Sequence, residues 1–167
     1  MTMANTFVHL RVHSEYSMVD GLVRVKPLIS RVAELGMPAV GLTEQSNMCS
    51  LVRFYKAAMG AGVKPIIGAD IWLENPDEPE TPFRLTLLAR DNDGYLNLTE
   101  IISQGYTEGQ RYGKPIVTRA WLESRREGLI ALSGAKLGDV GKALLAGKPD
   151  LARERLRYWM DLYPDSY

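Results

Sequence analysis

The sequence contains very few of the residues that cross-link a chain or bind transition metals. Its 167 residues include one cysteine, Cys49, and two histidines, His9 and His13. One cysteine excludes an internal disulfide framework and a cysteine-rich zinc site, and it is typical of a protein from a reducing compartment. The first six residues lack the basic and apolar regions of a signal peptide, and no apolar run approaches the ~20 residues that span a bilayer. We therefore predict a cytoplasmic protein that does not enter a membrane.

The chain also lacks a net charge. Lys and Arg together number 20, and so do Asp and Glu. This balance argues against a nucleic-acid contact carried by the overall charge of the segment, although it leaves a local basic patch open. Apolar residues make up 46% and charged residues 24%, which is ordinary for a globular protein, and the length is sufficient for one core. We expect residues 1–167 to form a single domain.

Short hydrophobic segments alternate with amphipathic segments along the chain. Expected strands cover residues 7–13, 39–43, 64–73, 83–90 and 128–133. Expected helices cover residues 25–35, 49–61, 95–106, 118–125, 139–146 and 150–163. This order favours an α/β fold with mostly parallel strands and one antiparallel hairpin near residues 64–90, and both a barrel and an open sheet fit it. Because the chain stops just after a helix, where a further strand would be expected, the sequence looks truncated.

Periodicity and capping residues add local predictions. Asn92 is a suitable cap for the helix at 95–106, and Thr118 for the helix at 118–125. The acidic, proline-containing run at 74–82 predicts an exposed turn. Val8, Leu10 and Val12 fall on one face of the first strand. On the helix at 49–61, apolar residues recur at roughly helical spacing, at Leu51, Val52, Tyr55 and Ala58.

Polar side chains gather after three of the expected strands, in residues 9–20, 43–47 and 68–70. In α/β folds the carboxyl ends of strands are the usual place for a site. His9 and His13 share a strand face, and such spacing can bring two imidazoles to one metal. The alternative is that these side chains only satisfy local hydrogen bonds. Arg11 between them weighs against a metal, because a guanidinium is permanently cationic.

Four segments together resemble a known family. They are FVHLRVHSEYSMVDGL at 7–22, the run from Gly41 to Trp72, residues 95–103, and GLIALSGAKLGD at 128–139. In this order they resemble the PHP (polymerase and histidinol phosphatase) domain, in the form found in the alpha subunits of bacterial replicative DNA polymerase III. The resemblance implies the first part of a distorted TIM-like (βα)7 barrel. Metal-competent members of the family bind two or three metal ions and hydrolyse phosphoesters, in some bacteria for proofreading.

The first family motif is only partly retained. Arg11 stands where the family has the first histidine of its His-x-His pair, and His13 stands at the second. Asp20 matches the carboxylate that follows this motif. The resemblance therefore implies that a ligand has been replaced here by a cation.

The second and third motifs are altered as well. Glu44 and Gln45 replace an Asp-His pair, so a ligand histidine has become an amide, and Asp70 replaces a glutamate. We therefore predict a vestigial site with no catalytic residue and no metal, in which Arg11 pairs with Asp20 or Asp70. If a metal binds, its ligands are expected to be His13, Asp20 and Asp70.

For the whole protein the resemblance implies a DNA-directed DNA polymerase, with Mg²⁺ at a polymerase site downstream of this segment and DNA bound by downstream domains. It implies as partners the proofreading exonuclease (epsilon) subunit, for which this segment would be a docking platform, and the other holoenzyme subunits. The alternative is an active metal-dependent phosphoesterase with Zn or Mn at the PHP site. A stand-alone half-barrel with its own function is a third possibility, disfavoured because it would leave strand edges exposed.

The remaining conspicuous side chains have structural interpretations. Trp72, Trp121 and Trp159 fit core or half-buried positions better than a partner surface. The arginines of the helix at 150–163 alternate with acidic residues, which favours a solvated face over a DNA contact.

Overall fold

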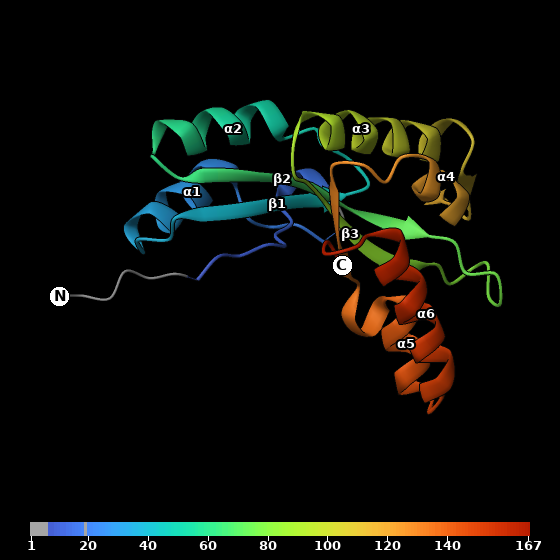
Figure 1. The fold of residues 1–167 in the computed structure, drawn as a ribbon. Helices are drawn as coiled ribbons and strands as arrows, with labels where there is room; N and C mark the ends of the chain where they lie inside the picture. The colour runs from blue at the N-terminus through green and yellow to red at the C-terminus, as the bar shows by residue number, and fades with distance from the viewer. Residues whose placement is uncertain (1–6, 19) are drawn as a thin grey trace. The chain divides into compact units, whose positions relative to one another are not determined.

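The structure is a computed structural model that describes residues 7–18 and 20–167 (Figure 1). The expectation for residues 1–6 lies outside this range. The chain is a mixed α/β protein that divides into two compact units, one ending at Ala69 and one running from Asp70 to Tyr167. None of the described helices has the length and apolar character needed to cross a membrane.

The elements alternate largely as the sequence predicts. The helices are α1 (Val25–Glu34), α2 (Leu51–Gly60), α3 (Asn92–Thr107), α4 (Arg119–Ser124), α5 (Asp139–Leu145) and α6 (Pro149–Leu162). The strands are β1 (Ala39–Gln45), β2 (Lys64–Leu73), β3 (Phe83–Ala89), β4 (Gln110–Arg111), β5 (Lys114–Val117) and β6 (Leu129–Ser133). Short 3-10 turns lie at Glu15–Ser17 (η1) and Ala135–Leu137 (η2).

The first unit packs α1 and α2 around β1, which pairs with β2. Val25, Ile29 and Val32 recur at helical spacing on α1 and are buried, which is why this segment forms an amphipathic helix. Gly36 follows the helix with a φ of 67°, a left-handed conformation that suits glycine and ends it. β1 is buried along nearly its whole length, which places the residues at its carboxyl end beside the core.

The predicted strand at residues 7–13 is wrong as a regular strand. The segment touches β1 through one parallel bridge, His9 to Val40, and through bonds from the amides of Gly41 and Thr43 to the carbonyls of His9 and Val12. The backbones approach closely at Gly41, where a Cβ would lie 2.6 Å from the carbonyl oxygen of Leu10, so this position suits glycine. Leu10 in this segment is 41% exposed.

The apolar residues noted at helical spacing on α2 are only partly buried. Phe54 and Ala58 are buried, whereas Val52 and Tyr55 are exposed. Both choices fit helical spacing, and the structure selects the stripe one position away because Phe54 fills the core beneath β1.

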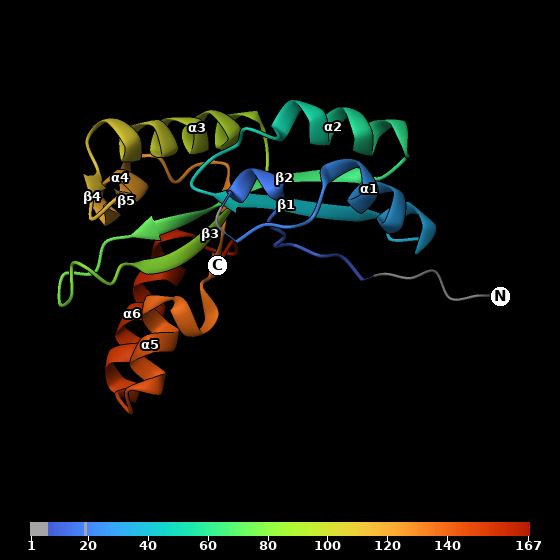
Figure 2. The same ribbon diagram turned by 180° about the vertical axis from the view of Figure 1, so that it is seen from behind.

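The second unit is built on a sheet with the strand order β4-β5-β2-β3-β6 (Figures 1 and 2). β2 and β5 are parallel, whereas β3 pairs with β6 and β4 with β5 in antiparallel fashion. Helix α3 lies on one side of β3, and α5 packs against α6 on the other side. The expectation of a mostly parallel sheet is therefore not confirmed, and the hairpin of β4 and β5 was not predicted.

Of the two residues noted at helix starts in this unit, Thr118 is an N-cap and Asn92 is not. Thr118 caps α4, accepting from the amide of Trp121. The cap of α3 is Asp91 rather than Asn92, because the Asp91 carboxylate accepts from the amide of Gly94. The hairpin of β4 and β5, which was not predicted, reverses direction at Tyr112 and Gly113. Both residues have positive φ, so the Tyr-Gly pair was a usable turn signal.

Candidate functional site

The predicted site residues are divided between the two units. Glu44 and Gln45 end β1, and His13 and Asp20 lie on either side of η1, all in the first unit together with Arg11. Asp70 is in the second unit, on β2.

Glu44 is the most thoroughly engaged of these residues. Its side chain is 1% exposed and accepts four hydrogen bonds. The amide and hydroxyl of Ser14 donate two of them, the first over 3.0 Å. The hydroxyls of Ser17 and Ser50 donate the others, over 2.6 and 2.9 Å. A buried carboxylate with four donors is fully satisfied, so Glu44 ties together η1, β1 and the start of α2.

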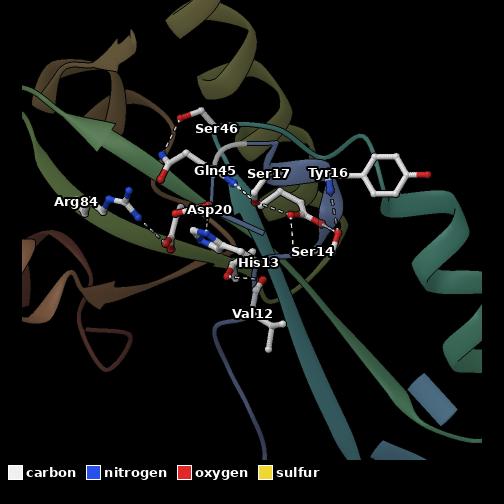
Figure 3. Close-up of polar contacts among 12 residues, drawn as sticks. Val12, His13, Ser14, Tyr16, Ser17, Asp20, Gln45, Ser46 and Arg84 are labelled. Carbon is white, nitrogen blue, oxygen red and sulfur yellow. Dashed lines mark hydrogen bonds and ion pairs between the residues drawn. The ribbon is translucent and has the colours of Figure 1, made fainter. Parts of the chain in front are cut away.

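His13 and Asp20 of the same unit form a hydrogen-bonded pair (Figure 3). The Nδ1 atom of His13 lies 2.8 Å from a carboxylate oxygen of Asp20, to which it donates. The histidine side chain is 8% exposed and the aspartate 38%. The carboxylate thus fixes the orientation of the imidazole ring, as a supporting carboxylate does for a metal-bound histidine.

Gln45 is the last residue of β1 and is held there by hydrogen bonds (Figure 3). Its side-chain amide donates to the hydroxyl of Ser46 over 3.2 Å, and its backbone amide donates to the hydroxyl of Ser17 over 3.0 Å. Asn47 then donates to the carbonyls of Tyr16 and Gln45, both over 3.1 Å. These bonds join the end of β1 and the loop after it to η1.

In the second unit, Asp70 is buried at 1% exposure. It accepts a hydrogen bond from the hydroxyl of Thr86 on β3. Arg84, whose guanidinium also lies 4.4 Å above the ring centre of Trp72, stands 3.9 Å from the carboxylate. Within this unit a guanidinium therefore stands beside the carboxylate that matches a family metal ligand. The predicted pairing of Arg11, which is exposed, with Asp20 or Asp70 stays a prediction.

The residues of the first unit do not fit a metal cluster. A bridging carboxylate needs oxygen lone pairs directed at the ions, and those of Glu44 are directed at serine donors. Gln45 supplies an amide, which is a poor ligand for zinc. Over residues 7–18 and 20–167, no group of three or more His, Cys, Asp or Glu side chains is arranged to hold a metal ion.

Sequence reasoning missed the residues that hold the carboxylates. These are Ser14, Ser17 and Ser50 around Glu44, and Thr86 and Arg84 beside Asp70. Ser14 and Ser17 stood within the first motif and were available as a signal, since a run of hydroxyls before a buried carboxylate predicts donors for it. Ser50, Arg84 and Thr86 carried no local signal, because only the fold brings them to their partners.

Comparison with known proteins assigns the chain to a family. The PHP domain model matches residues 9–167. The DNA polymerase III subunit alpha of Pseudomonas aeruginosa is 59% identical over 165 residues, and that of Escherichia coli (strain K12) is 48% identical over 161. These alignments cover 99% and 96% of this chain but 14% of each relative, so the chain spans about one seventh of their length.

Among solved structures, the chain is similar to a putative metal-dependent phosphoesterase from Bifidobacterium adolescentis. The TM-score is 0.45 at 13% identity, over 64% of this chain and 37% of the other. A likeness of this size is too low to bear on the fold or on the site.

Proposed function

The chain belongs to the PHP domain family, and on that premise we propose that it is the N-terminal PHP segment of the alpha subunit of a bacterial replicative DNA polymerase III. The relatives that bear this name are 42–59% identical over 96–99% of the chain, which supports the proposal. In this proposal residues 1–167 are the first portion of a single domain, a distorted TIM-like (βα)7 barrel, and later strands complete it.

The whole protein would then be a DNA-directed DNA polymerase, a nucleotidyltransferase of DNA replication in the cytoplasm. Its Mg²⁺ and DNA would be bound by domains downstream of this segment, and its partners would be the subunits of the polymerase III holoenzyme. Nucleotidyl transfer needs metal-binding carboxylates held in an open site, and none is assigned to this segment.

The segment itself would carry a vestigial metal site with a structural role. The observation that supports this proposal is the engagement of Glu44, whose carboxylate accepts four bonds from serine donors. Arg11 and Gln45 at two family ligand positions support it further. Hydrogen bonds and a guanidinium would stabilise the carboxylates that metal ions stabilise in other members.

The second candidate function is an active metal-dependent phosphoesterase with Zn or Mn at the PHP site. One observation favours it. His13 keeps an imidazole oriented by Asp20, and that arrangement is the one a metal-bound histidine requires. In this alternative the ligands would be His13, Asp20 and Asp70, completed by residues beyond this segment.

Metal analysis of the intact protein separates the two. After purification without chelator and dialysis against a few micromolar zinc or manganese, we expect far less than one ion per chain at the PHP site. A phosphodiester such as bis(4-nitrophenyl) phosphate should not be hydrolysed above the level of a His13→Ala variant. Stoichiometric zinc or manganese, with hydrolysis that a chelator abolishes, would establish the phosphoesterase instead.

The segment would also dock the proofreading exonuclease subunit, a role that the family resemblance supports. Cross-linking of the intact protein with that subunit tests it, because lysines report contacts within the reach of the reagent. We expect cross-links from the exonuclease to lysines of residues 1–167, among them Lys26, Lys56 and Lys64, which are exposed. A complex that forms and is cross-linked only to lysines beyond residue 167 would contradict the docking role.

A further inference from the structure

The neutral charge of the chain conceals a separation of charge along it. Residues 7–69 carry seven Lys and Arg against four Asp and Glu, whereas residues 70–167 carry 13 against 16. The first unit is therefore basic and the second acidic. Two of the four acids of the first unit face an arginine of their own, since Glu15 lies 3.9 Å from Arg24 and Glu34 lies 3.1 Å from Arg31.

Three of the seven Lys and Arg side chains of the first unit line one surface cavity. It has a volume of about 570 Å³ and is lined by Tyr16, Lys26, Cys49, Val52, Arg53, Lys56 and Ala57. Within the described part of the chain, no acidic side chain lines it, and neither Lys26 nor Lys56 forms an ion pair. Arg53 lies over the ring of Tyr16, 5.7 Å from its centre. The cavity is thus cationic on its rim and apolar or aromatic between.

From this arrangement we infer that the cavity between α1 and α2 binds the phosphate chain of a nucleotide, either free or within a single strand of nucleic acid. Three cations around one concavity match the charge of successive phosphates. The volume suits a ligand of nucleotide size. Val52, Ala57 and the ring of Tyr16 offer the apolar contact that a base or sugar needs, and a basic groove with an aromatic side chain is a common arrangement in proteins that bind single strands. The inference does not depend on the polymerase assignment.

The cavity contains its own reporter. Cys49 is the one cysteine of the chain and it is exposed, so a neutral reagent such as iodoacetamide modifies a single position at the cavity. We expect ATP, tripolyphosphate and a ten-residue dT oligonucleotide each to slow this alkylation at about 50 mM salt. For the oligonucleotide, three phosphate contacts give a slope of about −2 in log affinity against log salt, so affinity should fall roughly twentyfold between about 50 and 200 mM. Comparing ATP with the oligonucleotide distinguishes a free nucleotide from a strand as the source of the phosphates.

A charge-matched pair of variants makes the test specific. The combined variant Lys26→Gln, Arg53→Gln and Lys56→Gln should weaken protection of Cys49 by at least about tenfold, because it removes all three phosphate contacts. The control is the combined variant Arg24→Gln, Arg31→Gln and Lys64→Gln, which removes the same charge from exposed residues of the same unit that do not line the cavity. Thermal melts of both variants check that the fold is intact.

Three results would overturn the inference. One is that none of the three probes protects Cys49 in the folded protein. Another is that the control variant weakens protection as much as the cavity variant, which would show general attraction of anions. The third is that polyglutamate of equal charge protects as well as the oligonucleotide, which would indicate an acidic polypeptide as the ligand.

Discussion

Replacing Glu44 with alanine is expected to lower the free energy of unfolding by about 3–5 kcal/mol. The substitution removes the acceptor of four hydrogen bonds and leaves their donors buried around a cavity. Each buried donor without a partner costs about 1–3 kcal/mol, but the hydroxyls can rotate toward other acceptors, which keeps the total below the sum. Urea denaturation followed by far-ultraviolet circular dichroism measures the loss.

Two matched variants show whether the loss comes from the hydrogen bonds. Glu34→Ala removes the same side chain from an exposed position, where it faces only Arg31, and should change stability by about 0.5 kcal/mol or less. Glu44→Gln keeps the volume but replaces one acceptor oxygen by a donor, so we expect an intermediate loss of about 1–3 kcal/mol. A cost of less than about 1 kcal/mol for Glu44→Ala would mean that the serines find other partners and that Glu44 does not hold this motif together.

Most of the elements could be predicted because their residues decide them locally. Lys64–Leu73 was predicted with its observed bounds, since a long apolar run follows a glycine turn and a proline-rich loop ends it. Residues 7–13 could not be judged in the same way. Their alternation is that of a strand, but whether a ladder forms depends on the partner, and here the segment pairs with β1 through the bridge of His9 to Val40 without becoming a regular strand. Regular pairing is a property of two segments, which one segment does not encode.

The candidate site shows the same division between local and tertiary information. The position of each carboxylate could be found from the motifs, because Glu44 and Asp70 stand at or near strand ends. The groups that neutralise each carboxylate could not be found from the motifs. Family resemblance directs attention to metal ligands and to Arg11, whereas the structure surrounds Glu44 with serine hydroxyls and places Arg84 and Thr86 beside Asp70. Donors of this kind come from distant positions in the sequence, so only the folded chain identifies them.

Trp159→Ala is the second substitution expected to have a large effect, a loss of about 3–5 kcal/mol in the free energy of unfolding. Trp159 is 0% exposed and is the largest fully buried side chain of the described residues. Its ring stacks with those of Tyr163 and Tyr167, at centre distances of 6.4 and 5.9 Å. Burial raises the pKa of both phenols, so both stay neutral and suited to this apolar cluster.

The indole nitrogen of Trp159 adds a polar contribution to this packing. It donates to both carboxylate oxygens of Asp139, over 3.0 and 2.9 Å, and Asp139 also accepts from Arg119 over 2.9 Å. This links α6 to the start of α5 and, through Arg119, to α4. Trp159→Phe keeps most of the aromatic volume but removes the donor, and we expect it to cost about 1–3 kcal/mol.

Trp121→Ala is the matched control, because it makes the same change at a half-buried position of the same unit. Less apolar surface is buried there, so the expected loss is about 1–2 kcal/mol. Denaturation of the three variants by urea, followed by circular dichroism rather than by tryptophan fluorescence, ranks them on one scale. Equal losses for Trp159→Ala and Trp121→Ala would contradict the assignment of Trp159 as the centre of the second unit's core. A negligible loss for Trp159→Phe would show that packing alone, and not the bond to Asp139, joins these helices.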